Sequence, residues 1–413
     1  MKAGLFHARH SSMKTNTLLL SLSLGALLGA PAAASPAVLL APAPTAAAVL
    51  PPADPDHFLF MVGGDNRSTG HGYPMPPVWA TICREIGYIH PAFVLTTGDA
   101  IEGYGDTPAE ANAEYDVFLQ DVSLCGVPVY CAPGNHEFSL DPALLPVYTK
   151  RIGKLYGSFD YGHSHFIAVN SNPVGTDGTI KSGSIDEAEF AWLQADLEAN
   201  KGAANTFVFL HHYVFGPPDP DTPTVSSGFI DLAARDRLHA LMVHYKVRAV
   251  FCGHNHIYYH QVKDGIDYYI SGGGGAPLDA DPEHGGYLHY VGVQVDGAAI
   301  TTTVLQPEHL EVAYPDGEAK IGPTQRVWAT NTNFSPVVAN HIVLHVAAPP
   351  AGQRLGVTAV LAYKKKNKPG IARIVSQSPG AQPGTVDVVI SATLPKARTS
   401  EITVGPSAVT AGQ

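Results

Sequence analysis

The pattern of apolar and polar positions divides the chain after residue 56 into short strands and amphipathic helices. Apolar runs predict buried strands, and these cover residues 57–63, 93–97, 127–132, 158–170 (more than one strand), 206–210 and 249–252. Apolar side chains at helical spacing predict helices, and these cover residues 78–88, 109–124, 185–200 and 232–245. Strands that alternate with helices are typical of parallel sheets, so we expect an α/β fold here.

Further along the chain the pattern becomes purely β. Strands predicted at 268–271, 287–295 and 299–305 complete the first region, and the strand count favours two sheets packed face to face with helices outside. Residues 308–325 are rich in proline, glycine and charge and predict a linker. From 326 to 404 alternating segments recur about every 10 residues, which predicts a small C-terminal β-sandwich domain.

The N-terminus has the pattern of a targeting segment. An apolar run at 18–28 and a stretch of alanines at 32–34 follow three cations, Lys2, Arg9 and Lys14. This order predicts a signal peptide over residues 1–34, with Met13 as an alternative start. The run is short for a membrane span, so we expect the mature chain to be exported to the periplasm or the extracellular space. The Ala/Pro-rich residues 35–56 predict a flexible linker.

Net charge and cysteine content bear on the binding partners and on possible disulfides. The net charge is −11, and removal of the signal segment makes it more acidic, which argues against a nucleic-acid-binding surface. The cysteines are Cys83, Cys125, Cys131 and Cys252, a set that allows three pairings. Export permits disulfides, and Cys83 and Cys125 are the pair that could form one.

Side chains of the metal-ligand type follow the predicted strands where each one ends. They are Asp65, Asp99, Asn135 with His136, His211, and His254 with His256. Imidazole and carboxylate together suit Zn, Fe or Mn, and six donors are too many for one tetrahedral ion. They fit two adjacent ions that share one carboxylate. His254 and His256 are two positions apart at a strand end, so their side chains point the same way.

The runs GGD, TGDAIE, PGNHE, FLHHY and CGHNH resemble, in order and spacing, the motifs of the calcineurin-like metallophosphoesterase superfamily. The resemblance covers residues 57–306, and the glycine run of 271–278 is similar to that of the secreted, purple-acid-phosphatase-like branch. It implies a four-layer α/β/β/α sandwich as the catalytic domain at 57–307. The site residues follow by the same resemblance: Asp99 bridges two ions, Asp65 and His256 bind the first, Asn135, His211 and His254 bind the second, and His136 faces the phosphate.

The sequence departs from the superfamily's pattern at two positions. Arg67 stands where the D-x-H histidine is expected, and its planar fork suits phosphate oxygens, so we assign it a catalytic role beside His136. Glu102 stands where many members have Asp or Asn and purple acid phosphatases have Tyr. It could bind the first ion, hydrogen-bond a ligand or be exposed. The SGGGGAPL segment at 271–278 could cradle a phosphate or allow close backbone packing.

The expected function is hydrolysis of a small phosphate ester by a hydroxide that bridges two divalent or trivalent ions of Fe, Mn or Zn. A phosphomonoesterase is the leading expectation. A phosphodiesterase acting on nucleotides or lipid head groups is the first alternative. A non-catalytic binding module, in which Arg67 marks lost activity, is the second. The sequence carries no signal for the oligomeric state or for the role of the C-terminal domain.

Overall fold

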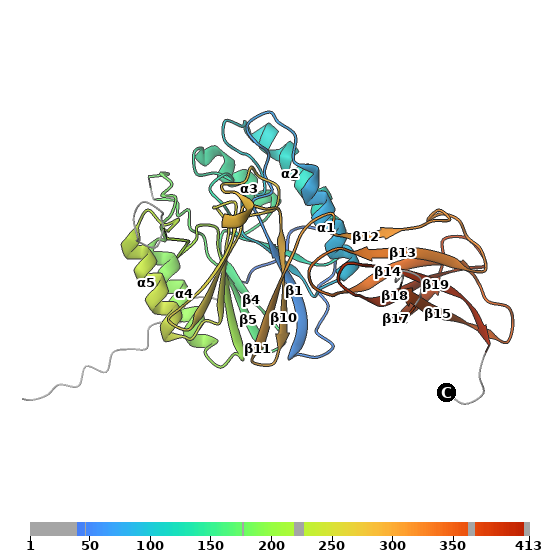
Figure 1. Ribbon diagram of the computed structural model, residues 1–413. Helices are drawn as coiled ribbons and strands as arrows, with labels where there is room; N and C mark the ends of the chain where they lie inside the picture. Colours follow the sequence, from blue (N-terminus) through green and yellow to red (C-terminus); the bar gives the residue numbers. More distant parts are fainter. Residues whose placement is uncertain (1–38, 46, 176, 219–226, 362–367, 409–413) are drawn as a thin grey trace, which may run out of the picture. The chain divides into compact units, whose positions relative to one another are not determined.

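The computed structural model describes residues 39–45, 47–175, 177–218, 227–361 and 368–408 (Figure 1). The predicted signal peptide lies outside these residues. Across the part of the chain that is described, no helix has both the length and the apolarity that crossing a bilayer requires.

Two sheets lie face to face in the first part of the chain. The first has five strands in the order β11-β10-β1-β2-β3, and these are β1 (His57–Gly63), β2 (Val94–Thr96), β3 (Val129–Cys131), β10 (Tyr290–Asp296) and β11 (Ala299–Leu305). The second has six strands in the order β4-β5-β6-β7-β9-β8, and these are β4 (Gly157–Tyr161), β5 (Ser164–Ala168), β6 (Asn205–Phe209), β7 (Ala249–Cys252), β8 (Tyr258–Lys263) and β9 (Ile266–Ser271). The strands β1-β2-β3 are mutually parallel, and so are β5-β6-β7-β9.

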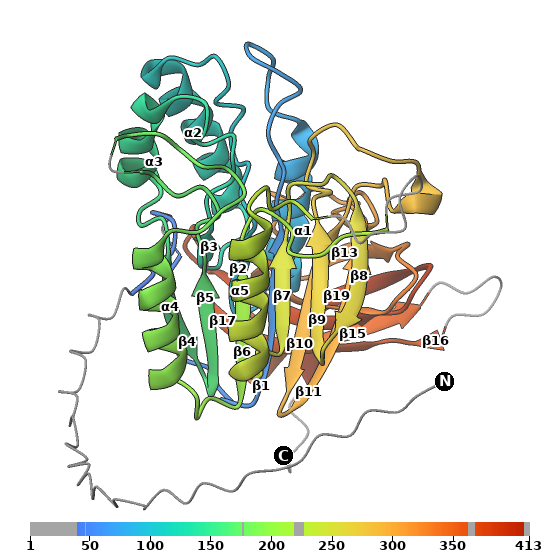
Figure 2. The same ribbon diagram turned by 90° about the vertical axis from the view of Figure 1, so that its left-hand side faces the viewer.

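Helices cover the outer face of each sheet. The first sheet carries α1 (Pro77–Ile89), α2 (Pro108–Ser123), the short η1 (Pro142–Leu144) and α3 (Leu145–Arg151). The second carries α4 (Glu187–Ala199) and α5 (Leu232–His244), which lie in front of it in Figure 2. Between the sheets lies a core of aromatic rings from both, which includes Phe60, Phe93, Phe166 and Phe207. The predicted four-layer α/β/β/α sandwich is confirmed.

The N-terminal residues 39–45 differ from the predicted linker. The amide of Leu40 donates to Ser158 O at 2.9 Å, and the amide of Ala43 donates to Val129 O at 2.7 Å. Ser158 belongs to β4 and Val129 to β3, the edge strands of the two sheets. Leu40 and Ala43 are buried. The flexible linker expected at 35–56 is therefore wrong for this stretch, because its apolar residues cover two sheet edges that would otherwise be open.

The C-terminal region is the predicted β-sandwich. One sheet has the order β12-β13-β19-β15-β16 and the other β14-β18-β17. Their strands are β12 (Leu310–Ala313), β13 (Gln325–Asn331), β14 (Val337–Ala347), β15 (Gln353–Leu361), β16 (Lys368–Pro369), β17 (Ile371–Pro379), β18 (Thr385–Leu394) and β19 (Arg398–Ala408). Strand β12 falls inside the predicted linker 308–325, because Leu310 is buried and the strand pairs with β13.

The sandwich packs on the helix face of the first sheet. Asn340 in β14 donates through Nδ2 to Ile89 O at the end of α1, at 3.2 Å. The amide of Leu310 donates to Glu85 Oε1 of α1 at 3.3 Å, and one apolar core runs from α1 and α2 into the sandwich. The two parts therefore share a buried contact, and residues 35–413 form one compact unit.

Candidate active site

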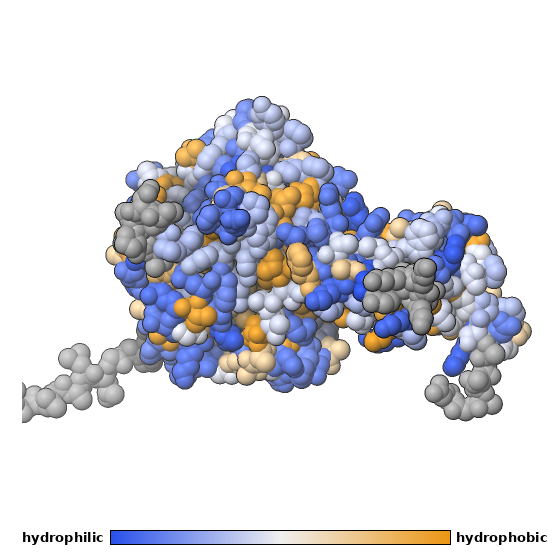
Figure 3. All heavy atoms as spheres, viewed as in Figure 1, coloured by the Kyte–Doolittle hydropathy of each residue, from blue (hydrophilic) through white to orange (hydrophobic). Residues whose placement is uncertain are grey.

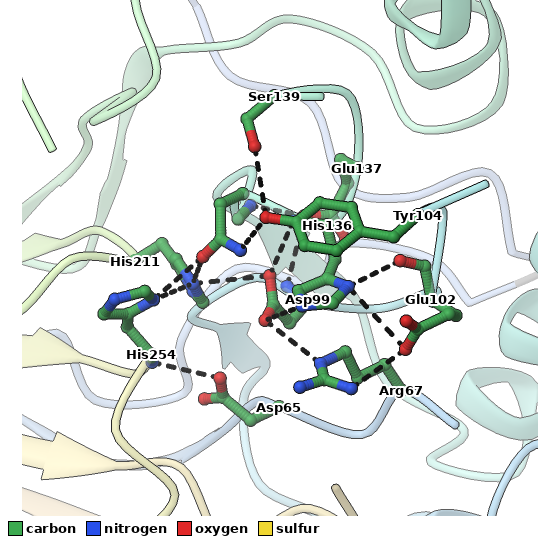
Figure 4. Close-up of polar contacts among 12 residues, drawn as sticks. Asp65, Arg67, Asp99, Glu102, Tyr104, His136, Glu137, Ser139, His211 and His254 are labelled. Carbon is green, nitrogen blue, oxygen red and sulfur yellow. Dashed lines mark hydrogen bonds and ion pairs between the residues drawn. The ribbon is translucent and has the colours of Figure 1, made fainter. Parts of the chain in front are cut away.

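The donors predicted from the sequence all follow strands, and the sheets bring those strand ends to one edge. Asp65 follows β1, Asp99 follows β2, and Asn135 follows β3, three neighbouring parallel strands. His211 follows β6, and His254 with His256 follows β7, on the facing sheet. Figure 4 shows Asp65, Asp99, His211 and His254 converging on a single space. All six donors are buried except His254, which is half-buried.

The backbone at these strand ends is held in an uncommon conformation. Asp65, Asp99 and His254 have positive φ angles of 56°, 55° and 73°, in the left-handed region that non-glycine residues seldom adopt. A Cβ added to Gly134 would overlap the carboxylate of Asp99. Such strain is concentrated where a fold must hold groups in one fixed geometry.

One group of donors surrounds the amide oxygen of Asn135. His211 Nε2 and His254 Nδ1 each lie 2.8 Å from Asn135 Oδ1 and 3.2 Å from one another, and Asp99 Oδ1 lies 3.3 Å from His211 Nε2. His211 Nδ1 faces Thr97 O at 2.8 Å and so carries the proton, which leaves a lone pair on Nε2. That lone pair faces the lone pairs of Asn135 Oδ1 and Asp99 Oδ1, and a cation bound among them would remove their mutual repulsion.

A second group lies beside it. Asp65, Asp99 and His256 each offer a donor atom within 4.8 Å of the others, with His256 Nε2 3.6 Å from Asp65 Oδ1. His256 Nδ1 faces Pro277 O at 2.5 Å, so here too the proton points away from the site. Asp65 Oδ2 is buried and has no hydrogen-bond partner among the described residues. Asp99 is the carboxylate common to both groups, so the donor set fits two adjacent cations.

Burial sets the charge of these groups. It lowers the pKa of His211 well below the usual value and that of His254 to about 4, so both imidazoles are neutral, the form that binds metals. Burial and then the charge of Asp99 raise the pKa of Asp65 well above its usual value. Burial and then the charge of Glu137 do the same to the pKa of Asp99. Positive charge placed between these carboxylates would therefore be strongly stabilising.

Comparison with known proteins places this arrangement in a family. The family model for calcineurin-like phosphoesterases matches residues 48–258, half of the chain. The chain belongs to the calcineurin-like phosphoesterase family. Members of this family are typically dinuclear metal enzymes. The family match and the grouped carboxylate and imidazole donors both indicate a metal-dependent phosphoesterase.

Individual relatives are distant. A probable glycerophosphodiester phosphodiesterase GpdQ from Arcobacter nitrofigilis is 29% identical over 175 residues, which are 40% of this chain and 57% of that protein. This chain thus spans little more than half of that relative. A dimetal phosphatase from Danio rerio is 14% identical, with 61% of this chain and 99% of that one covered and a TM-score of 0.44. GAP50, the anchor in the inner membrane complex of Plasmodium, is 12% identical over 61% and 85%, with a TM-score of 0.45.

Arg67, the first departure from the family pattern, is fixed beside the donors. Its Nη1 lies 2.9 Å from Glu102 Oε2 and 3.0 Å from Ser68 O, and its Nε lies 3.5 Å from Asp99 Oδ2. In Figure 4 the guanidinium lies between Glu102 and the space next to Asp65. Glu102 is buried, so of the three roles expected for it, the exposed one is wrong. In this structure its carboxylate holds Arg67.

His136 faces the same space in a defined tautomer. Its Nδ1 donates to Glu102 O at 2.5 Å, and its ring stacks on Tyr104 with the centroids 3.8 Å apart. Burial and then the nearby Arg67 lower the pKa of His136 to about 3. The Nε2 atom, 3.9 Å from Asp99 Oδ2, therefore presents a lone pair to the site. His136 accepts a hydrogen bond there and donates one only after it has taken up a proton.

The ring of the neighbouring His212 packs on His254, with the centroids 4.4 Å apart, but its ring nitrogens face other partners. Its Nδ1 lies 2.8 Å from Ser171 Oγ and its Nε2 lies 3.0 Å from Ser182 Oγ, so both ring nitrogens have hydroxyl partners. His211, in contrast, faces Asn135. The choice of His211 over His212 as a metal donor stays a prediction, which this geometry supports.

Sequence reasoning gave no role to Glu137, although it is part of the PGNHE run. Its buried carboxylate accepts the amide protons of Asp99 at 3.2 Å, Ala100 at 2.6 Å and Gly134 at 2.5 Å. It thus joins the loop after β2 to the loop after β3. Both ends of this link lie in recognised motifs, but nothing local in the sequence shows that they pair.

The glycine segment at 271–278 packs closely against the site's backbone. A Cβ on Gly272 would overlap Asn255 O, one on Gly273 would overlap the His289 ring, and one on Gly274 would overlap Gly64 O. The amide of Gly274 donates to Gly64 O at 3.0 Å. Of the two expectations for this segment, close packing explains its glycines, and that packing holds the loop of Asp65 in place.

Proposed function

We propose that the protein is an exported, dinuclear-metal phosphoesterase that hydrolyses phosphodiesters. The observation that carries the proposal is the presence of two adjacent groups of metal-donor side chains that share Asp99, with the Arg67 guanidinium beside them. Asp65, Asp99 and His256 would hold one ion, and Asp99, Asn135, His211 and His254 the other. When bound, the ions would lower the pKa of a water molecule and draw charge from the phosphoryl oxygens.

The chain's own residues supply orientation and charge. Thr97 O holds His211 and Pro277 O holds His256, each with its unprotonated nitrogen toward the site. Glu102 holds Arg67 so that its guanidinium can pair with a phosphate oxygen. His136 Nε2 can take a proton and return it to the leaving alkoxide. In the balanced reaction the oxygen of water bonds to phosphorus, one ester P–O bond breaks, and the departing alcohol keeps a proton.

The choice of a diester over a monoester rests on two supports. The relative from Arcobacter nitrofigilis is described as a glycerophosphodiester phosphodiesterase. In addition, the polar contacts of the described site include one lysine or arginine, Arg67, and no second one to compensate the additional negative charge of a monoester. A phosphomonoesterase, favoured by the sequence alone, is the second candidate.

The test combines metal analysis with a pair of aryl esters. Purified mature protein is expected to contain two ions of Fe, Mn or Zn per chain and to hydrolyse bis(p-nitrophenyl) phosphate faster than p-nitrophenyl phosphate. Chelation should abolish both activities and reloading should restore them. Near-zero activity of both the apo and the metal-loaded protein would instead favour the non-catalytic module. N-terminal sequencing of protein from the extracytoplasmic fraction tests export and cleavage after residue 34.

A further inference from the structure

A cavity of about 780 Å³ opens directly beside the candidate active site. It lies between the turn that follows β7, the start of β8 and the short helix η2 (Pro282–His284). Asn255, which lines it, stands between the two histidines His254 and His256 in the chain. Asp279, another lining residue, accepts the amide proton of His256 at 2.7 Å. The cavity and the phosphate position therefore share one wall.

The charges that line this cavity are of one sign. Asp279, Asp281 and Glu283 are exposed, and no lysine or arginine occurs among the described residues of its lining. His284 contributes its Nδ1 to Asp281 at 2.7 Å, and His256 contacts Asp279 through its amide and, at 3.9 Å, through its ring Nδ1. Glu283 is thus the acid of this lining with no basic partner among the described contacts. Figure 3 shows η2 as a strongly hydrophilic cluster on the face that it views. An anionic group would be repelled from this cavity, and a cationic one attracted.

Three tyrosines also contribute to the wall. Tyr258, Tyr259 and Tyr287 line the cavity and are half-buried, and the rings of Tyr258 and Tyr287 lie 6.3 Å apart at an angle of 38°. Aromatic faces combined with carboxylates are the chemistry that binds alkylammonium ions, because the ring quadrupole and the negative charge both attract a weakly hydrated cation. A neutral sugar or a nucleobase could stack and hydrogen-bond in such a cavity, but only a cation gains from its net negative charge.

We infer that this cavity binds the cationic alcohol portion of the substrate, a quaternary ammonium alcohol of the choline type esterified to the phosphate. The inference rests on the proposed function and narrows its substrate class to zwitterionic phosphodiesters. The phosphate would lie at the two donor groups and Arg67, while the ammonium group would lie against Glu283 and the tyrosines. The P–O bonds made and broken are those of the hydrolysis described above.

The test compares two esters of equal shape. One is p-nitrophenyl phosphorylcholine and the other is its uncharged isostere, p-nitrophenyl 3,3-dimethylbutyl phosphate. The metal-loaded protein is expected to hydrolyse the choline ester with a kcat/KM about tenfold higher. Glu283→Gln, in an exposed side chain, should reduce the ratio of the two kcat/KM values to about threefold or less. Glu311→Gln, an exposed acid on β12, should leave the preference intact.

Equal kcat/KM values for the two esters would overturn the inference while leaving the proposed function standing, and so would an unchanged preference in Glu283→Gln. If neither these esters nor bis(p-nitrophenyl) phosphate is hydrolysed, the proposed function fails, and binding to the cavity is then measured directly. Tyrosine fluorescence is then followed during titration with choline and with 3,3-dimethylbutanol. Binding of choline alone, weakened by Glu283→Gln, supports a cation site, whereas absence of choline binding refutes it.

Discussion

Glu137 offers the sharpest test of how the site is held together. Its carboxylate is 1% exposed and accepts three buried backbone amides, from Asp99, Ala100 and Gly134. In the variant Glu137→Ala these three donors lose their acceptor. The loops after β2 and β3 then lose the link that fixes Asp99, the shared carboxylate, next to the segment that carries Asn135.

The magnitude follows from the three amides. A buried donor left without an acceptor costs about 1–3 kcal/mol, so three of them cost about 3–9 kcal/mol before the site relaxes. Water entering the space left by the carboxylate satisfies part of this. We therefore expect Glu137→Ala to lower the free energy of unfolding by about 3–4 kcal/mol. That is a large share of the ~5–15 kcal/mol typical of a domain.

Urea unfolding followed by tryptophan fluorescence measures this loss, and metal analysis reports the state of the site. The matched control is Glu189, whose equally buried carboxylate accepts one amide, that of Asn170 at 2.7 Å, on the second sheet. Glu189→Ala should cost about 2 kcal/mol less than Glu137→Ala and should keep its metal. Equal losses in the two variants, or full metal content in Glu137→Ala, would refute the reasoning.

The remaining predictions concern metal, substrate and pH. Asp99→Ala should abolish hydrolysis and lower the metal content below that of the unaltered protein; retained activity would contradict its role as the shared ligand. Removing metal with a chelator should lower the unfolding midpoint, because metal present at 100 times its Kd contributes about 2.7 kcal/mol, and scanning calorimetry with added Mn or Zn would detect the recovery. Arg67→Lys should lower kcat/KM for a diester about tenfold through loss of the paired guanidinium fork while leaving metal content unchanged, which steady-state kinetics and metal analysis together would check. Burial raises the pKa of Glu85 from 4.5 to about 7, so the folded state holds this proton more tightly than the unfolded chain and stability falls as the pH rises from about 4.5 to 7. Glu85→Gln should therefore be more stable than the unaltered protein at pH 8 by up to about 3 kcal/mol, with the gap closing below pH 4.5, as read from unfolding curves at both pH values.

The pattern of apolar residues predicted the central strands of the two sheets, because a strand that is buried on both faces has a continuous apolar run. Strand β1 has the predicted bounds, 57–63, since five of its seven residues are buried. Strand β8 was missed because its residues are exposed or half-buried at the edge of the sheet, so its sequence lacks an apolar run. Strand β12 was missed because only Leu310 is buried within a segment otherwise rich in turn residues.

The donor residues could be predicted because each one directly follows a strand, and parallel neighbours bring such ends together. The side chains that hold the donor loops in place, Glu137 and Asp279, could not be predicted. Glu137 bonds to amides 37 and 38 positions away, and Asp279 holds an amide 23 positions away, so no local spacing marks them. All four cysteines are free in the structure, and the thiols of Cys83 and Cys125 lie against one another. The sequence could suggest that these two cysteines are neighbours, but it could not show whether they form a disulfide, because that depends on the geometry of the pair.

The short segment at 39–45 has a structural role of its own. By pairing with Ser158 and Val129 it caps one end of both sheets, where unpaired backbone would otherwise recruit strands from other molecules. A polypeptide beginning at residue 47 would keep every donor of the active site and yet expose the unpaired backbone of the edge strands β3 and β4. We therefore expect resistance to aggregation to depend on these few residues that precede β1.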